Sequence, residues 1–393
     1  MKKINLLYVL DNPASVHEYR FLSMISADQD INLYVASCSP VEFREDIQKL
    51  NLKIFKSPEH KISCSLPLIN GLLHSFRYYC FTGYLKKLIN ELKIDLVHSG
   101  WLSLSSYAVL KTGFHPVLAM SWGSDVLNNP CNETPHNSKH LLEKIKFVAK
   151  NSDAIYSDAN YVADTLVEIT GIKKDKISVF PQMGVDMNLY NPDDEKRNVT
   201  RDRLNLQGQV VFLSTRVFLP VYAVDQTIKA FKNIKNNYDN VKLILCGNGP
   251  LENQLKTLVS NIGLEGSVIF TGNIYDHEII DYYRASDVYI SNSLSDGTSS
   301  SLLEAMCCGM PIIVSDLPTN MEWIKDRDNG FIIERNNIKS IYDKMLYCVM
   351  NQDAIKKLGI KNINIAQEKI DMNKNYMKLK KIYLSLTCQT HQK

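Results

Sequence analysis

The chain lacks the features that mark several classes of protein. Its nine cysteines are scattered through 393 residues and none forms a Cys-x-x-Cys spacing, which argues against a disulfide framework or a zinc site and indicates a reducing compartment. A formal net charge of only +3 gives no reason to expect nucleic-acid binding. No apolar run is long enough to span a bilayer, and we find no internal repeat or low-complexity segment. These absences predict a cytoplasmic globular protein.

The N-terminal segment imitates a short signal peptide, because two lysines precede a mostly apolar run. Asp11-Asn12-Pro13 interrupts that run early. We therefore interpret the segment as the first buried strand of a parallel sheet rather than as a targeting signal. The length of the chain suggests two domains.

Short apolar runs alternate with helix-length amphipathic segments along the whole chain. The strands predicted in the first half are Ile4–Leu10, Asn32–Ser37, Lys53–Lys56, Leu96–Ser99, Val117–Trp122, Ala154–Ser157 and Ile177–Pro181. Those predicted in the second half are Val210–Thr215, Val241–Cys246, Ser267–Thr271, Val288–Ser291, Ile312–Ser315 and Phe331–Ile333. This alternation predicts an α/β fold of two doubly wound, Rossmann-like domains, with ligands at the carboxyl ends of the strands.

The stretch SNSLSDGTSSSLLEAMCCGMP, residues 291–311, is the most informative. A strand leads into a turn with the carboxylate of Asp296 and several small residues, and a helix predicted over Leu302–Cys308 carries Glu304. Backbone N–H groups and the helix dipole make such a turn an anion site, while two carboxylates suit sugar or ribose hydroxyls. The pattern favours a sugar nucleotide. The alternative is a simple N-cap followed by a solvated Glu304.

Two acidic residues separated by seven positions, followed by Ala-Met-Cys-Cys-Gly-Met-Pro, resemble the signature of the family 4 glycosyltransferases. Asp296 stands where most of that family has Glu, and its Asp-Gly-Thr-Ser form resembles one branch. The resemblance implies the GT-B fold, in which two Rossmann-like domains face each other across a cleft. It also implies sugar transfer with retention of anomeric configuration.

The domain boundary is expected near residues 182–200. Pro181–Asp186 resembles the segment that links the two GT-B domains, and Asp193–Arg203 is charged without apolar periodicity. We expect an acceptor-binding domain over residues 1–185, a donor-binding domain over 186–370, and a tail over 371–393. A basic amphipathic helix predicted over Gln367–Leu386 would, by the resemblance, cross back onto the first domain.

The second half carries further residues that suit a donor pocket. Arg216 ends a strand, where a guanidinium can hold a diphosphate by paired hydrogen bonds, although a surface salt bridge is the alternative. In the family a lysine usually follows, and here Tyr222 stands in its place. This departure leaves the donor open, including one with a single phosphate such as a CMP-sugar. By the resemblance, the donor-binding residues are Gly247, Asn248, Gly249, Gly272, Asn273, Ile274, Gly297, Thr298, Ser299, Ser300, Ser301 and Glu304.

The first half resembles the family in fewer places. Asp95–Trp101 and Met120–Asp125 look like two of its acceptor-side segments, but Trp122 replaces a histidine and cannot accept a proton. Asp125 is then either a helix cap or a sugar ligand. The residues expected at the acceptor are Asn12, His17, His98, Trp101 and Trp122, although a histidine like His17 in a first helical turn is often merely exposed.

The expected catalytic residues are Asp296, Arg216 and Asp125. No Asp-x-Asp of the metal-binding kind follows a strand, so we expect neither a metal ion nor a cofactor. The leaving phosphate would be stabilised by Arg216, the amides of Ser299–Ser301 and the helix dipole.

The sequence thus predicts a retaining, hexosyltransferase-like enzyme that moves a sugar from a nucleotide-sugar donor to a glycan or lipid-linked acceptor in surface polysaccharide or glycoconjugate synthesis. Two alternatives stay open, a nucleotide-sugar 2-epimerase and a non-catalytic GT-B partner protein. Residues 61–93 join an apolar run to lysines and tyrosines, which suits peripheral contact with the inner face of the cell membrane or a core helix with a solvated face.

Overall fold

The computed structural model describes residues 3–390 except 38, 40, 51, 58–66, 103, 130–133, 135, 182 and 275, and only the backbone of 67–78, 276, 389 and 390. The chain divides into two compact units. Unit 1 comprises residues 1–128, 133–183 and 376–393, and unit 2 comprises residues 129–132 and 184–375.

Unit 1 is built on a seven-stranded parallel sheet with the order β3-β2-β1-β4-β5-β6-β7. Its strands are β1 (Ile4–Val9), β2 (Ile31–Ser37), β3 (Lys53–Lys56), β4 (Leu96–Ser99), β5 (Val117–Ser121), β6 (Ala154–Ser157) and β7 (Ile177–Val179). The helices are α1 (Val16–Ser26), α2 (Glu45–Lys49), α3 (Pro67–Glu91), α4 (Ser105–Lys111), α5 (Lys139–Asn151) and α6 (Asn160–Thr170). The central strands are almost completely buried, which explains their continuous apolar runs.

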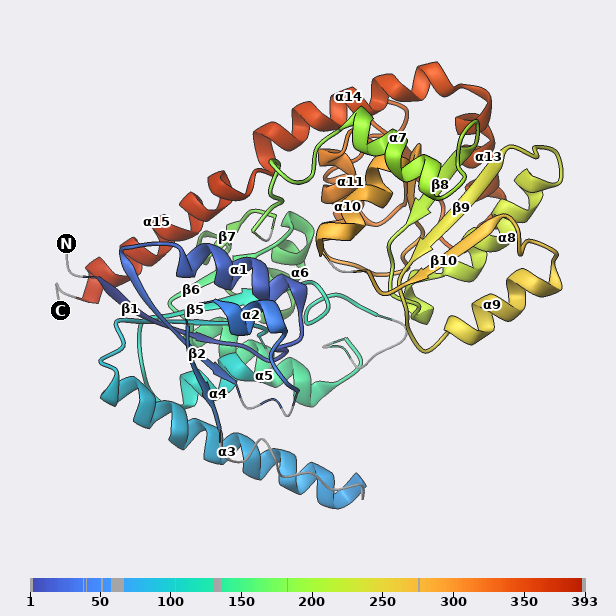
Figure 1. Cartoon of the computed structure of the whole chain (residues 1–393). Helices are drawn as coiled ribbons and strands as arrows, with labels where there is room; N and C mark the ends of the chain where they lie inside the picture. Colours follow the sequence, from blue (N-terminus) through green and yellow to red (C-terminus); the bar gives the residue numbers. More distant parts are fainter. Residues whose placement is uncertain are drawn as a thin grey trace. The chain divides into compact units, whose positions relative to one another are not determined.

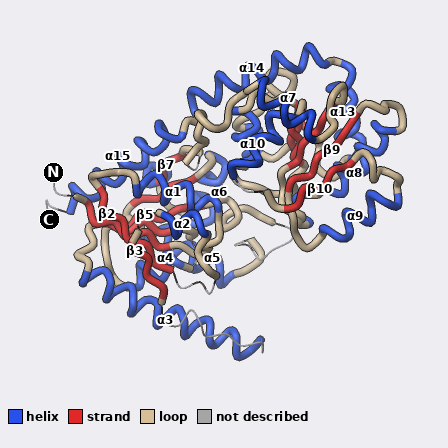
Figure 2. The backbone as a smooth tube through the Cα atoms, in the orientation of Figure 1, coloured by secondary structure: helices blue, strands red, loops and turns tan. Residues whose placement is uncertain are grey.

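Unit 2 is built on a six-stranded parallel sheet with the order β10-β9-β8-β11-β12-β13. Its strands are β8 (Val210–Ser214), β9 (Val241–Cys246), β10 (Val268–Gly272), β11 (Val288–Ser291), β12 (Ile312–Ser315) and β13 (Phe331–Ile333). The helices are α7 (Asp194–Arg203), α8 (Val224–Lys235), α9 (Glu252–Asn261), α10 (Asp276–Ala285), α11 (Ser300–Cys307), α12 (Pro318–Met321), α13 (Ile338–Met350) and α14 (Gln352–Lys369). Figure 1 shows β8, β9 and β10 running side by side, and Figure 2 shows the strands of both sheets in red.

The expected α/β class and the two doubly wound sheets are therefore confirmed. All thirteen predicted strands are present, with ends that differ by at most two residues. The helix after the acidic turn begins at Ser300, two residues earlier than expected, and ends at Cys307. Because parallel strands and their crossover helices have distinct apolar patterns, the positions of the strands can be predicted from the sequence.

Helix α7 is a feature that the apolar pattern does not indicate, because the charged segment over Asp193–Arg203 is helical. Arg197 donates to the carboxylate of Asp287 and to the carbonyl oxygens of Arg284 and Ser286. Arg201 is buried and donates to the carbonyl oxygens of Ala285, Leu206 and Gln209. Arginine side chains, rather than an apolar stripe, thus attach this helix to the segment that precedes β11.

The tail helix expected from about Gln367 starts later, at Met372, because a break separates it from the preceding helix. Helix α14 ends at Lys369, and α15 (Met372–Thr390) starts after a break. At the break, Val185 donates its N–H to the carbonyl of Ile370 at 2.9 Å and accepts from the N–H of Met372 at 3.1 Å. The backbone groups of Ile370 and Met372 that bond to Val185 are therefore not available for the hydrogen bonds of a continuous helix. From Tyr376 onward α15 belongs to unit 1.

No helix in the described part of the chain is long and apolar enough to cross a membrane. The start of the segment proposed for membrane contact, residues 61–66, lies outside the described residues, as do the side chains of residues 67–78.

Candidate active site

Arg216 lies two residues beyond β8 and is the centre of a polar cluster in unit 2. Its Nη1 donates to Ser299 Oγ at 2.6 Å and to Ser301 Oγ at 3.2 Å, and its Nη2 donates to Asp296 Oδ2 at 2.6 Å. The residue is only 8 % exposed, and its Nε is buried without a hydrogen-bond partner within the described residues. The structure therefore brings together Arg216 and the acidic turn, which lie some eighty positions apart in the sequence.

The pKa values of both members of this ion pair are raised, for different reasons. Burial raises the pKa of the Asp296 carboxyl, while the Arg216 guanidinium and the Gly297 N–H oppose that rise. Burial alone would lower the pKa of Arg216, but the neighbouring carboxylate reverses this effect and raises it. A buried pair of this kind is costly to break, about 3–5 kcal/mol when one partner is removed.

The N-terminus of α11 lies against Arg216. Ser299 is the N-cap residue, yet its side chain makes no capping hydrogen bond. Its Oγ instead accepts from Arg216 and lies 3.0 Å from Ser301 Oγ, which itself lies 2.7 Å from the hydroxyl of Tyr289. The simple N-cap interpretation does not hold for Ser299, and a guanidinium beside a helix N-terminus is a favourable setting for an anion.

Glu304, the second acidic residue, is buried at 6 % exposure within α11. Its Oε2 accepts a hydrogen bond of 2.8 Å from the hydroxyl of Tyr283, which lies 3.0 Å from Thr215 Oγ1. A solvated Glu304 is therefore excluded. Tyr283 lies outside the acidic motif, and no local signal in the sequence reveals its contact with Glu304.

Tyr222, which stands where the family has lysine, stacks on Arg216. Its ring centroid lies 4.0 Å from the guanidinium carbon, and such contacts are worth about 2 kcal/mol when they are desolvated. The next residue, Ala223, has φ 44° in the left-handed region, where a non-glycine residue costs about 1–2 kcal/mol. The ring that lies over the cation is therefore followed directly by a strained residue.

The glycines after β9 are required by close packing within the protein. A Cβ atom at Gly247 would lie 2.5 Å from the carbonyl oxygen of Arg216, and one at Gly249 would lie 2.7 Å from that of Phe218. Asn248 between them accepts from the N–H of Phe218 at 2.8 Å. This loop therefore supports the segment after Arg216.

The remaining expected donor residues lie in two loops, except Ser300, which is the first residue of α11. Gly272 has φ 71° with open space where a side chain would project, and Asn273 beside it is exposed. Ile274 is partly buried against the core of unit 2, whereas Thr298 is 3 % exposed. Within the acidic turn, the carbonyl oxygen of Asp296 accepts from Thr319 at 3.0 Å, which fixes the turn to α12.

In unit 1, Asp125 connects the loops that follow two adjacent strands. Its Oδ1 accepts from the N–H of Trp122 and its Oδ2 from the N–H of Leu102, both at 3.0 Å. It is 5 % exposed, and burial raises its pKa to about 6. Asp125 caps a turn rather than a helix, and it fixes the loops on which the expected acceptor residues lie.

Four expected acceptor residues lie at this edge of the sheet. The rings of His17 and Trp122 are in contact, with centroids 5.3 Å apart. Trp101 is 37 % exposed with φ 27°, and Asn12 is exposed and accepts from the N–H of Ala14 at 3.1 Å. The edge therefore presents aromatic and amide groups.

His98 has a different environment. It is fully buried, and its Nδ1 lies 2.6 Å from the hydroxyl of Tyr383 on α15. Burial lowers its pKa to about 3, so the ring is neutral. We therefore assign His98 to the core of unit 1, where it anchors the last helix.

Two further carboxyl groups that the sequence did not single out lie near the same edge. Burial raises the pKa of Asp11, which accepts from Ser105 Oγ at 2.6 Å, to about 7. Burial likewise raises the pKa of Glu18, which accepts from the hydroxyl of Tyr8 at 2.7 Å, to about 8. Their position in a small-residue loop and a first helical turn gave no sign of this burial.

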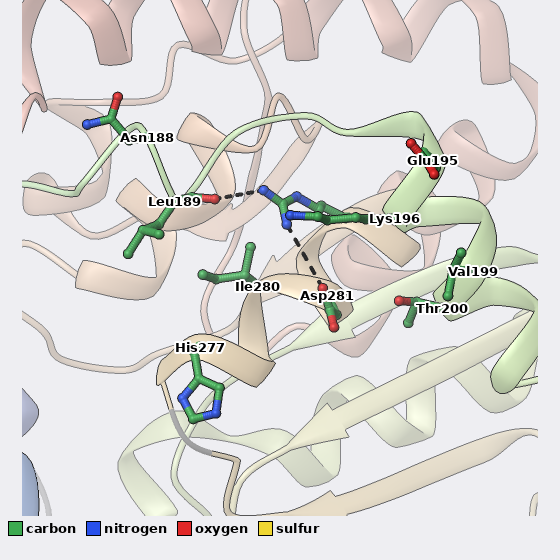
Figure 3. Close-up of a pocket in the computed structure, with 10 residues that line it drawn as sticks. Asn188, Leu189, Glu195, Lys196, Val199, Thr200, His277, Ile280 and Asp281 are labelled. Carbon is green, nitrogen blue, oxygen red and sulfur yellow. Dashed lines mark hydrogen bonds and ion pairs between the residues drawn. The ribbon is translucent and has the colours of Figure 1, made fainter.

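A hollow of about 540 Å³ in unit 2 contains none of the expected site residues (Figure 3). It is lined by Asn188, Leu189, Glu195, Lys196, Val199, Thr200, His277, Ile280, Asp281 and Arg284. Arg284 donates to the carbonyl of Leu189 at 2.8 Å and lies 3.9 Å from the carboxylate of Asp281. Its guanidinium is therefore committed to holding the chain segment before α7.

Among the described residues, no group of three or more His, Cys, Asp or Glu side chains is placed to hold a metal ion.

Two family models match the chain. One, described as "Glycosyl transferases group 1", matches residues 196–364, and the other, "Glycosyl transferase 4-like", matches residues 7–159. The matched segments contain the Arg216 cluster and the edge around Asp125, respectively.

Individual proteins are similar at lower identity. An uncharacterized glycosyltransferase of Methanocaldococcus jannaschii is 23% identical over 93% of this chain and 93% of its own length. The alpha-monoglucosyldiacylglycerol synthase of Streptococcus pneumoniae is 26% identical over 67% of this chain and 62% of its own length. The crystal structure of Anabaena HepE in complex with UDP-glucose matches with a TM-score of 0.78 at 16% identity, covering 98% of this chain and 100% of that one. The fold is that of the GT-B enzymes.

Proposed function

The chain belongs to the group 1 glycosyl transferases, and we propose that it transfers a hexose from a nucleotide-sugar donor to a glycan or lipid-linked acceptor with retention of configuration. The observation that carries this proposal is the cluster in which Arg216 joins the first turn of α11 to Asp296. Synthesis of a surface polysaccharide or glycoconjugate is the process that such a reaction would serve.

The leaving phosphate takes up negative charge as the bond to the sugar breaks. In our proposal the Arg216 guanidinium and the N-terminus of α11 stabilise this charge, because both are fixed before the reaction and partly shielded from water. The Ser299 and Ser301 hydroxyls that hold Arg216 also keep it at the helix end. Asp296, beside Arg216, provides the negative charge that would stabilise an oxocarbenium-like sugar.

Glu304 has a separate role in this proposal. A carboxylate that is buried and held by the Tyr283 hydroxyl keeps a defined orientation, and it can accept hydrogen bonds from ribose or sugar hydroxyls. In unit 1, we propose that the acceptor contacts Trp122, His17, Trp101 and Asn12. Since Trp122 cannot take a proton, residue 122 does not act as a base here.

Nucleotide release in a panel of UDP-, GDP-, ADP- and CMP-sugars tests the proposal. UDP-glucose is the first donor to try, since the HepE structure was determined with it. Release should occur with at least one donor and should fall about 100-fold or more in Glu304→Gln. Glu368→Gln, on the exposed face of α14, is the matched control and should match the wild type.

Four outcomes would contradict the proposal or a part of it. Unchanged release in Glu304→Gln would overturn the site, and an absence of nucleotide binding would favour a non-catalytic partner protein. Formation of a new sugar nucleotide without acceptor would favour a 2-epimerase. Proton NMR of the first product should show the donor's anomeric configuration, whereas the opposite configuration would exclude retention.

We also propose peripheral contact with an anionic membrane through α3. Its described C-terminal part exposes Tyr79, Lys86 and Lys87 along one helical face, a combination that suits an anionic lipid surface. Binding to vesicles containing phosphatidylglycerol should decrease with added salt and with Lys86→Glu/Lys87→Glu. Equal sedimentation with neutral vesicles would contradict the proposal.

A further inference from the structure

The aromatic side chain of Tyr222 covers one face of the Arg216 guanidinium. Tyr222 ends a short 3₁₀ helix, Pro220–Tyr222, between β8 and α8, and its ring centroid lies 4.0 Å from the guanidinium carbon. A ring at this distance restricts the plane in which a guanidinium can lie, and it attracts the positive charge. Stacking therefore restrains the orientation of the guanidinium plane, in addition to the hydrogen bonds that hold its nitrogen atoms.

The nitrogen atoms of Arg216 are only partly used by the protein. Nη1 is committed to Ser299 and Ser301 and Nη2 donates to Asp296, but Nε is buried and has no hydrogen-bond partner within the described residues. A buried donor without a partner is unfavourable. Because Arg216 is 8 % exposed and lies at a helix N-terminus, an anionic ligand is the partner that this donor fits.

The backbone around Tyr222 shows that its position is enforced. Ala223 has φ 44° in the left-handed region, which alanine rarely adopts. The segment is held in this conformation by the hydrogen bond from the N–H of Leu294 to the carbonyl of Val221 at 2.7 Å. Leu294 immediately precedes the acidic turn, so the ring is positioned from the same loop that supplies Asp296.

We infer that Tyr222 is a positioning residue, which orients Arg216 by stacking and leaves the donor phosphate to be held by one guanidinium, two serine hydroxyls and a helix N-terminus. The inference rests on the proposed function, since it assumes that the anion is a nucleotide phosphate. An arginine that is paired with Asp296, and that has a tyrosine beside it where the family has lysine, discriminates weakly between one and two phosphates. Tyr222 therefore helps to set the phosphate preference of the site.

Calorimetric titration with UDP, GDP, ADP and CMP first identifies the nucleotide that the wild type binds. Tyr222→Phe keeps the ring and should bind it within about three-fold of the wild type. Tyr222→Leu removes the stack and should weaken binding by about ten-fold, and it should lower kcat for nucleotide release. Tyr347→Leu, at a partly exposed tyrosine on α13, is the matched control.

Tyr222→Lys tests the phosphate preference. A second cation should raise the ratio of diphosphate to monophosphate affinity several-fold above that of the wild type, and the gain should shrink with added salt. If the wild type binds a nucleotide but Tyr222→Leu binds it equally well, the positioning role is overturned and the proposed function stands. An unchanged ratio in Tyr222→Lys would refute the inference that Tyr222 helps to set the phosphate preference. A wild type that binds none of the nucleotides overturns both.

Discussion

The hydroxyl of Tyr283 on α10 donates a 2.8 Å hydrogen bond to Oε2 of Glu304 on α11 and lies 3.0 Å from Oγ1 of Thr215 beyond β8. One phenol thus connects the second acidic residue with the strand that leads to Arg216. Tyr283 and Glu304 are buried and Thr215 is half-buried, so the position of Glu304 depends on a residue outside the acidic motif.

Removing this hydroxyl should loosen Glu304 without removing its charge. We expect Tyr283→Phe to lose about 1–3 kcal/mol of stability, because Glu304 and Thr215 lose a buried partner, and to reduce nucleotide release less than Glu304→Gln does. Urea unfolding and release kinetics measure the two effects. Tyr347→Phe is the control, and release equal to the wild type in Tyr283→Phe would contradict a positioning role.

Arg216→Lys tests whether the cluster needs a guanidinium or only a positive charge. A lysine cannot donate to Asp296 and to both serines in the fixed geometry of the guanidinium, so we expect release to fall about 100-fold. Arg327, whose side chain is 79 % exposed and lies 3.8 Å from the carboxylate of Asp326, offers the control Arg327→Lys. A variant Arg216→Lys with full activity would show that charge alone suffices.

The parallel strands are the part of the fold that the sequence predicts best, because buried strands such as β11 and β12 are continuous apolar runs. The pattern gives no such signal for α7, whose arginines bind carbonyl oxygens and Asp287 rather than an apolar core. The break between α14 and α15 also escapes prediction, since Val185 supplies the competing hydrogen bonds from far away in the sequence.

The same distinction applies to the candidate site. Asp296 and Glu304 can be predicted as site residues because both belong to one local sequence motif. Arg216 can be predicted because it is a cation at the end of a strand. The hydrogen-bond partners of these residues cannot be predicted in this way, since the Ser299 side chain binds Arg216 instead of capping its own helix. Pairings of this kind depend on the tertiary fold, which no local pattern encodes.

Glu18 should make the stability of the protein depend on pH. Its pKa rises from 4.5 to about 8 on folding, so the folded state binds a proton that the unfolded state releases between these values. Stability should therefore decrease as pH rises from about 4.5 to about 8 and change little above that range. Glu18→Gln, whose amide oxygen can still accept from Tyr8, should flatten this slope and be more stable than the wild type at pH 8. Urea unfolding at a series of pH values measures it, and an unchanged slope would contradict the raised pKa.

The last helix should be essential to unit 1. Tyr383 is fully buried and its hydroxyl lies 2.6 Å from His98, so Tyr383→Ala should cost about 3–5 kcal/mol through the cavity and the lost hydrogen bond. Leu384→Ala, at the neighbouring residue that is 39 % exposed, should cost far less. Urea unfolding compares the two, and equal stabilities would show that α15 contributes little to this core.

Ala223 offers a way to separate stability from binding. Glycine adopts a φ of 44° without strain, so Ala223→Gly should stabilise unit 2 by about 1 kcal/mol. If the strained backbone helps to hold Tyr222 on Arg216, the same change should weaken nucleotide binding, because the added freedom lets the ring leave the guanidinium. Arg327→Gly is the control, since Arg327 also has a positive φ, 63°, and is 79 % exposed in its side chain. It should stabilise the protein and leave binding unchanged. Urea unfolding and calorimetry together decide the matter, and a destabilised Ala223→Gly would show that the left-handed backbone is not strained.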